Sequence, residues 1–431
     1  MVRSRRLLIL SQVYVPDPAS VGQHLHDVAK EMAHRGWDVH VICSSRGYDD
    51  PTHCYPKHEH RDGVTIRRYD LPLFSKTNMI VRVLGSAWAM LALFFLALFS
   101  GRIDVVLFST SPPLVGLLGI TVAALKQAKP VYWAMDLNPD QLVAMGKLSP
   151  RSLMYRGLER ANKIILSRSR LTITLDRFMA ERLHGNGRRP QQVLTIPPWP
   201  HESSVEPVAH ADNSFRHEHG LDGKFVIMYS GNHSPANPLD TLLAAMEKLQ
   251  DDDSLRFAFI GGGMDKPKVK KFIAERGLKN VLELPYQPLE KLRYSLSAAD
   301  VHVVSLGEGM VGIIHPCKVY GAMTVGRPLL FLGPSPSHVD DLLQADDIGR
   351  SVKHGDVEGC VAAINALRAL PAKHRESMGV TAKRVLDATL SERRLNGQFC
   401  DAIERLSTAS EGSAAIAPPP RPPAPAIGRR A

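Results

Sequence analysis

The chain has few cysteines, and they are not spaced as zinc ligands usually are. Its five cysteines, in 431 residues, form neither a CxxC pair nor a disulfide-like framework. The sequence therefore indicates neither a structural zinc site nor an extracellular disulfide scaffold. A reducing cytoplasm is the compartment that agrees with this pattern.

A secretory leader is not expected either. The opening stretch MVRSRRLLILSQVYVPDP places basic residues before an apolar run. That run is too short for the core of a signal peptide, and no small-residue cleavage site follows it. We interpret it as the first buried strand.

One apolar segment, Val83 to Ser100, has 18 uncharged residues between Arg82 and Arg102. It is compatible with a buried core helix, a helix with one face in a membrane, or a true span. Because strand-like IDVVLFST follows at once, a span would cut the first domain in two. The sequence favours a helix that touches the membrane, with Arg67 and Arg68 as further contacts to anionic lipid.

Basic residues outnumber acidic ones, giving a net charge of +10 and a pI near 9.4. This excess indicates an anionic partner. Nucleic acid, an anionic membrane surface and a phosphorylated substrate all qualify, and charge alone does not choose among them.

Apolar strands alternate with amphipathic helices along most of the chain. LLILSQVYV and WDVHVIC read as strands around the helix SVGQHLHDVAKEMAHRG, whose Val21, Leu25, Val28 and Met32 share one face. The order strand, helix, strand predicts a parallel sheet with right-handed crossovers. The alternation stops at a Pro-rich region from Pro197 to about Gly223 and then restarts with FVIMYSG.

The restart predicts two tandem doubly wound α/β domains with a cleft between them. We expect an N-terminal domain at 1–200, a linker at 201–222 and a C-terminal domain at 223–409, whose last helix can pack back on the first domain. The Pro- and Ala-rich tail, 410–431, should be disordered.

In such sheets ligands bind at the carboxyl ends of the strands. In the first domain, Gly22 follows the first strand and would let the backbone approach a ligand, with His26 near the same helix start. Asp136 and Asp140 follow a later strand, four residues apart. An ordinary turn and helix capping are the simpler interpretations of these two loops.

In the second domain, Gly231 and Asn232 could present backbone amides at a helix start, where the helix dipole favours anions. The stretch GEGMVGIIHPCKVYGAMTVGRP carries a single lysine, Lys318, between Glu308 and Arg327. Pro316 suits a first helical turn, and the ammonium beside free amides would form an anion site. A plain connecting loop and a surface lysine are the alternatives.

These motifs, in this order, resemble the family 4 retaining glycosyltransferases of the GT-B fold. Within them the chain is most similar to the bacterial branch that builds cell-surface polysaccharides on lipid carriers. The resemblance covers about residues 5 to 405 and rests on YVPDPASVGQHLHDVAKEMAHRGWDVHVIC, TLDRFMAERL with VLTIPPW, YSGN, FIGGG and HPCKVYGAMTVGRP.

The resemblance implies an N-terminal acceptor domain and a C-terminal domain that binds a nucleoside diphosphate sugar without a metal. The residues it places around the donor are Gly22, Gly231, Asn232, Glu308, Gly309, His315, Pro316, Cys317 and Lys318. Lys318 would stabilise the leaving diphosphate, His26 or Asp136 would orient the acceptor hydroxyl, and Asp140 would lie on the acceptor side. It also implies a lipid-linked saccharide acceptor, a place on the inner face of the cytoplasmic membrane, and no nucleic-acid partner.

The chain departs from the family pattern at two places. Its loop GNHSPANP lacks the Arg and Lys of many members, and Gly321 stands where the family's helix usually has a ribose-binding Glu. Glu308 is our candidate replacement. Two other classes stay open: an epimerase of nucleotide-sugars with the same fold, and a non-catalytic sugar-nucleotide-binding protein.

Overall fold

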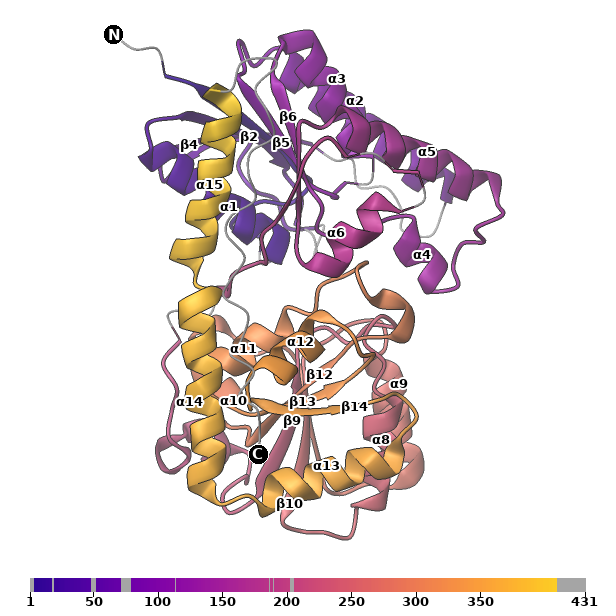
Figure 1. The fold of residues 1–431 in the computed structure, drawn as a ribbon, viewed down its shortest axis with the longest axis vertical. Coiled ribbons are helices and arrows are strands. Elements are labelled where there is room, and N and C mark those ends of the chain that lie inside the picture. The colour runs from indigo at the N-terminus through magenta and orange to yellow at the C-terminus, as the bar shows by residue number, and fades with distance from the viewer. Residues whose placement is uncertain are drawn as a thin grey trace, which may run out of the picture. The chain divides into compact units, whose positions relative to one another are not determined.

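Figure 1 shows the computed structural model of the chain, which describes residues 4–17, 19–47, 52–70, 79–112, 114–185, 187–188, 190–201 and 205–408. The tail predicted to be disordered, 410–431, lies outside the described residues, as do the side chains of 79–84, 86 and 87. The chain divides into two compact units. The first runs to Pro198 and includes the helix from Arg393, and the second runs from Trp199 to Glu392.

The first unit is built on an eight-stranded sheet of order β3-β4-β2-β1-β5-β6-β7-β8, in which every pair except β3 with β4 is parallel. The central strand β1 is fully buried from Leu7 to Leu10, as expected for a parallel sheet covered on both faces. The strands are β1 (Arg6–Leu10), β2 (Asp38–Ser44), β3 (His58–Arg61), β4 (Val64–Tyr69), β5 (Val105–Phe108), β6 (Lys129–Trp133), β7 (Leu171–Thr174) and β8 (Val193–Thr195).

The edge hairpin β3–β4 is a feature that the strand and helix alternation does not predict. Asp62 and Gly63 form its two-residue turn, and both have positive φ, 50° and 79°. This is the backbone that Asp-Gly favours between antiparallel strands. The hairpin adds an antiparallel edge to the predicted parallel sheet.

Seven helices of the described residues belong to the first unit. They are α1 (Ser20–His34), α2 (Met79–Leu98), α3 (Val115–Lys126), α4 (Asp140–Ala144), α5 (Leu153–Arg168), α6 (Arg177–His184) and α15 (Glu392–Thr408). In α1, Leu25, Val28 and Met32 of the predicted face are buried.

Helix α15 packs in the first unit although it ends the described chain. Its Phe399 is fully buried, with its ring centroid 4.4 Å from that of Trp133. Asn396 Nδ2 donates to the carbonyl of Asp27 at 3.1 Å. Arg35, which follows the end of α1, is ion-paired with Glu404 near the end of α15 at 2.8 Å. The first unit is therefore assembled from both ends of the chain.

Helix α2 covers most of the apolar segment from Val83 to Ser100, which the sequence alone left open as a core helix, a membrane-touching helix or a span. Leu93 and Ala97 are buried, so one face contributes to the core. Within the described residues, no helix of the chain is long and apolar enough to cross a membrane. The prediction that Arg68 contacts lipid is wrong, because its side chain is buried and ion-paired with Glu59 at 2.8 Å.

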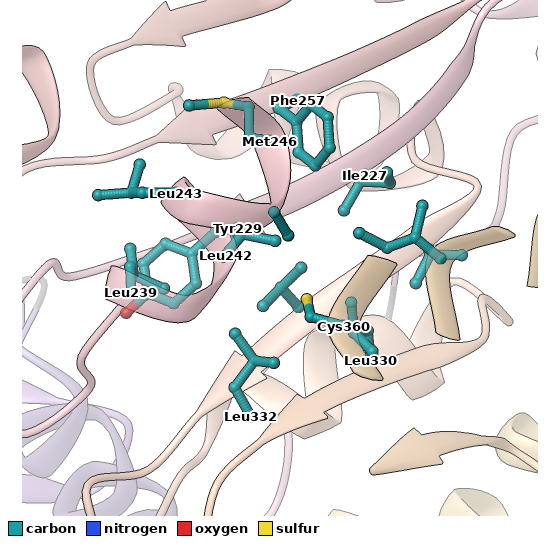
Figure 2. Packing of buried hydrophobic residues seen from close by; sticks show 14 of the residues in the cluster. Ile227, Tyr229, Leu239, Leu242, Leu243, Met246, Phe257, Leu330, Leu332 and Cys360 are labelled. Atoms are coloured by element: carbon teal, nitrogen blue, oxygen red, sulfur yellow. The ribbon is translucent and has the colours of Figure 1, made fainter. Parts of the chain in front are cut away.

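The second unit is a six-stranded parallel sheet of order β11-β10-β9-β12-β13-β14. Figure 2 shows part of its core, where Ile227 and Leu330 of the sheet meet Leu242 and Met246 of α8 and Cys360 of α13. Its strands are β9 (Phe225–Ser230), β10 (Leu255–Ile260), β11 (Val281–Leu284), β12 (Val301–Ser305), β13 (Leu329–Leu332) and β14 (Gly349–Val352). Its helices are α7 (Ser214–Glu218), α8 (Asp240–Lys248), α9 (Lys266–Arg276), α10 (Leu292–Ser297), α11 (Lys318–Thr324), α12 (His338–Ala345), α13 (Val357–Ala369) and α14 (Ala372–Thr389).

Part of the expected linker has its own structure. Phe215 of α7 and Leu221 are buried in a small cluster with Val226 and Met228 of β9. These residues therefore pack as part of the second unit.

Candidate functional site

The strongest candidate site lies after the carboxyl end of β9, where Lys318 at the start of α11 reaches the loop at Gly231. A Cβ built on Gly231 would lie only 2.8 Å from Cε of Lys318. The ammonium lies 5.2 Å from the centroid of the Tyr229 ring. The structure thus brings Lys318 beside Gly231, two residues that the family resemblance places around the same donor.

The charge of Lys318 has no counter-ion among the residues that the structure describes. Within the described residues, its ammonium makes no hydrogen bond and no ion pair. Burial lowers the pKa of Lys318 to about 8, while Cys317 acts weakly in the opposite direction. Because burying an unpaired charge is costly, this position is suited to a cation that receives an anion from outside the protein.

The loop at Gly231 is held by the glycines that follow β10. Gly261 has φ +117°, and a Cβ there would lie 2.2 Å from the carbonyl oxygen of Gly231. Gly263 is equally constrained, because its Cβ would lie 2.1 Å from Oδ1 of Asn232. Asn232 itself is exposed, and its carbonyl accepts a hydrogen bond from the Tyr229 hydroxyl at 2.9 Å. The two loops therefore fit together only with glycine at these positions.

His233 holds this loop against the loop after β10, and the sequence did not indicate it as a site residue. Its Nδ1 lies 3.1 and 3.2 Å from the carbonyls of Gly231 and Gly262, so this nitrogen carries the proton. Burial lowers the pKa of His233 to about 4, with the nearby charges of Lys266 and Lys318 adding to the effect. The ring is therefore neutral and serves to fix the loop.

The entry to α11 follows the predicted form in part. The helix begins at Lys318, with buried Pro316 two residues earlier and exposed Cys317 at the preceding cap position. His315 is buried, and its Nε2 lies 2.6 Å from the Tyr320 hydroxyl. Its ring therefore faces the interior of the second unit, where it packs beside His338.

Glu308 and Gly309 lie on an exposed 3₁₀ turn after β12. The preceding Gly307 donates its N–H to the carbonyl of Ala236 at 2.9 Å, which joins this turn to the loop after β9. Glu308 lines a cavity of about 340 Å³ together with Pro238, Thr241 and His354. At Gly321, the family's ribose position, an added Cβ would lie 3.7 Å from Cδ1 of Leu296, an ordinary van der Waals contact.

In the first unit, Gly22 lies inside α1, and a Cβ there would lie 3.0 Å from Cα of Tyr14. The close approach that this glycine permits is therefore to the chain's own backbone. Both ring nitrogens of His26 have neighbours, with Nδ1 3.0 Å from the Tyr14 hydroxyl and Nε2 3.0 Å from Oδ2 of Asp62. Burial lowers the pKa of His26 although Asp62 opposes the shift. An acceptor hydroxyl would have to displace one of these contacts.

The two aspartates differ in environment. Asp136, after β6, makes no hydrogen bond or ion pair within the described residues, and burial raises its pKa to about 6. Asp140, at the start of α4, is buried and has both oxygens engaged, one by Arg182 and one by Arg188. This geometry favours a structural role for Asp140 and leaves Asp136 as the more available carboxylate.

Binding a metal ion would need several suitable side chains close together in the part of the chain that the structure describes. No group of three or more His, Cys, Asp and Glu side chains there could hold an ion.

Two tandem doubly wound units are the architecture of the GT-B class of glycosyltransferases. Residues 20–199 match the model described as "Glycosyl transferase 4-like domain", and residues 212–385 match "Glycosyl transferases group 1". The chain belongs to the family 4 glycosyltransferases, whose members are retaining enzymes.

Individual relatives agree with this assignment. The chain is 25% identical to a probable glycosyltransferase, WbjE of Pseudomonas aeruginosa, over 94% of this chain and 99% of that protein. It is also 25% identical to a putative colanic acid biosynthesis glycosyl transferase, WcaI of Escherichia coli, over 89% and 96%. Among solved structures, Anabaena HepE in complex with UDP-glucose superposes with a TM-score of 0.69 at 14% identity, covering 93% of this chain and 99% of that one.

Proposed function

We propose that the chain transfers a sugar from a nucleoside diphosphate sugar to a lipid-linked saccharide, with retention of configuration, during cell-surface polysaccharide synthesis. The names of WbjE and WcaI support the reaction, the name of WcaI also supports the pathway class, and the UDP-glucose held by HepE supports the donor class. The observation that carries the proposal in this chain is the unpaired ammonium of Lys318 against Gly231.

In this proposal the donor diphosphate lies beside Lys318, with the backbone N–H of Asn232 as a further donor. The expectation that Gly231 offers its amide is wrong, because its N–H donates to the carbonyl of Ile260 at 2.9 Å, and the N–H of Cys317 donates to the carbonyl of His315 at 3.0 Å. Asn232 is exposed, and its loop is fixed by the glycines after β10. Glu308 and Gly309 lie on the exposed turn joined to that loop and are the candidates for the ribose. Gly22 lies against Tyr14, and His315 lies against Tyr320, and these contacts explain both residue types without a ligand. They are therefore weaker candidates for donor binding than the other residues named from the sequence.

The chemical role of Lys318 follows from the charge that develops during transfer. As the bond from the sugar to the diphosphate breaks, negative charge grows on the leaving phosphate oxygen, and a fixed cation there lowers the barrier. The acceptor hydroxyl attacks the anomeric carbon on the same face and passes its proton to that phosphate oxygen. Asp136 and His26 are proposed to orient the acceptor hydroxyl. Asp136 is the stronger candidate, because no other described residue engages its carboxylate, whereas both ring nitrogens of His26 have neighbours.

A lipid-linked acceptor also implies where the protein works. We place it at the inner face of the cytoplasmic membrane, as a protein bound to the surface and not inserted across it.

A binding screen followed by product analysis tests the proposal. Nucleotides and nucleotide-sugars that bind the native state should raise its melting temperature. With the best donor and a lipid-linked saccharide extract, the product should keep the anomeric configuration of the donor. An isomerised donor formed without any acceptor would instead indicate an epimerase, and binding without hydrolysis or transfer of any donor would indicate a non-catalytic protein.

A further inference from the structure

One face of helix α2 is apolar and uncovered. Trp88, Leu91 and Phe95 of α2 are 53%, 54% and 52% exposed, and Phe99, just beyond the helix end, is 77% exposed. Their spacing of three or four residues places them in one row, since the N–H of Phe99 still donates to the carbonyl of Phe95 at 3.0 Å. The opposite face, with Leu93 and Ala97, is buried in the first unit. This helix therefore presents apolar side chains to the core and to the outside at once.

Further apolar side chains are exposed on a nearby helix of the same unit. Helix α3 contacts α2 on one side and α5 on the other, and Figure 1 shows the three helices together in the first unit. At the start of α5, Leu153 and Met154 are 82% and 58% exposed. We call the six residues Trp88, Leu91, Phe95, Phe99, Leu153 and Met154 the α2–α5 surface.

The charges of these three helices are almost all positive. Their basic residues are Arg82, Lys126, Arg156, Arg160, Lys163 and Arg168, and their one acidic residue is Glu159. Glu159 is buried and ion-paired with Arg188 at 2.7 Å, so it offers no charge to the outside. Arg156, Arg160 and Arg168 are exposed, and none of the three makes an ion pair in the described part of the chain.

We propose that the α2–α5 surface docks the first unit on an anionic lipid bilayer. An exposed row with Trp and Phe suits the boundary between headgroups and acyl chains, and the exposed arginines of α5 suit anionic headgroups. A second copy of the chain is a poorer occupant, because it would bring the same excess of positive charge against this face. The inference rests on the membrane location proposed above and is independent of the transfer reaction.

Tryptophan fluorescence gives a direct test with the full chain. Of the four tryptophans, Trp37, Trp133 and Trp199 are buried and Trp88 is exposed. On adding phosphatidylcholine vesicles that contain phosphatidylglycerol, the emission should shift to the blue and be quenched by brominated lipid. Pure phosphatidylcholine should bind much more weakly, and salt raised from about 0.05 to about 0.5 M should release most of the protein. Trp88→Phe should remove the shift while vesicle sedimentation persists.

Two matched pairs of variants distinguish vesicle binding through the α2–α5 surface from nonspecific adsorption. Phe95→Gln with Phe99→Gln should weaken vesicle binding at least about 10-fold, whereas Leu289→Gln with Val380→Gln, on exposed apolar residues of the second unit, should leave it unchanged. Arg156→Gln with Arg160→Gln should weaken binding to anionic vesicles several-fold. Lys279→Gln with Lys373→Gln removes the same charge from exposed positions of the second unit and should have little effect.

Three results would overturn the docking proposal: a wild-type chain that ignores anionic vesicles, equal losses for surface and control variants, or a dimer in solution that buries Trp88. Resistance to alkaline carbonate would show insertion across the bilayer and would also overturn it. Donor hydrolysis measured without vesicles is the separate readout for the proposed transferase. Hydrolysis without vesicle binding would contradict only the docking proposal. Vesicle binding without hydrolysis would contradict only the proposed transferase activity.

Discussion

At the scale of single residues, Lys318 carries the most specific prediction. Lys318→Ala should lower turnover at least about 100-fold, because it removes a positioned charge that acts as the leaving group becomes negative. The melting temperature should stay the same or rise slightly, since burial already disfavours this ammonium and lowers its pKa to about 8. Steady-state kinetics and thermal denaturation of the same preparations measure both.

Two further variants sharpen that result. Lys318→Arg should recover part of the activity, because a planar guanidinium does not replace a compact ammonium in the narrow space beside Gly231. Lys279→Ala, on an exposed lysine of the second unit, should behave like the wild type. Near-normal transfer by Lys318→Ala would leave Lys318 as an ordinary surface lysine.

Asp136 carries a prediction about pH. Burial raises its pKa from 3.8 to about 6, so the folded state binds the proton more tightly than the unfolded state does. The stability linked to this proton is present below about pH 4 and is lost as the pH rises through about 6. Asp136→Asn should therefore raise the melting temperature at pH 8, by an amount corresponding to at most about 3 kcal/mol, and the gain should vanish near pH 4.

The matched control for Asp136 is its neighbour in sequence. Asp140→Asn breaks contacts with Arg182 and Arg188 and should lower the melting temperature at neutral pH, because it leaves buried Arg188 short of a partner. Equal effects of both changes, in the same direction, would contradict the different environments described for the two carboxylates.

At the scale of secondary-structure elements, the fit of the β9 loop on the β10 loop determines the shape of the proposed diphosphate site. Gly261→Ala should weaken nucleotide binding at least about 10-fold, because a Cβ would meet the Gly231 carbonyl at 2.2 Å and displace that loop. Gly277→Ala is the control. It also has a positive φ, +61°, but nothing lies within 4 Å of its Cβ, so it should cost only about 1 kcal/mol of stability. Calorimetric titration with UDP or GDP would compare them.

Elements with strong periodicity could be predicted from the sequence, and short or polar elements could not. The parallel strands and α1 follow from apolar runs and from the face that Leu25, Val28 and Met32 share. Strand β3 could not be found in this way, because HEHR is a polar edge strand. The Asp62-Gly63 pair was the available signal for its hairpin.

A site residue could be predicted where its residue type was unusual for the surrounding sequence. A single lysine in an uncharged run pointed to Lys318, and the family resemblance grouped it with Gly231 around the donor. The sequence could not show that His233 fixes the loop, because that depends on tertiary packing. Arg68 shows the same limit, since its ion pair with Glu59 forms only across β3 and β4. Glycine at 22 was explained as a ligand contact, although Tyr14 is what lies against it.

At the scale of the whole molecule, we predict that nucleoside diphosphates bind without magnesium. The proposed cation for the diphosphate is Lys318, which the chain supplies itself. Affinity for UDP and GDP, whichever is bound, should be similar with magnesium and with an excess of EDTA. A chelator that abolishes binding would refute the metal-free donor site.

The membership of α15 in the first unit has a consequence for the order in which the protein can mature on the ribosome. Phe399 supplies a buried ring against Trp133, and residues 199–392 are synthesised before it. The second unit can thus fold before α15 has been synthesised. The first unit is synthesised first, but it cannot complete its fold until α15 leaves the ribosome. A fragment ending at Pro198 should be poorly folded and protease-sensitive, and a synthetic peptide of residues 392–408 added in trans should protect it. Full protection of the fragment without the peptide would show that the first half matures alone.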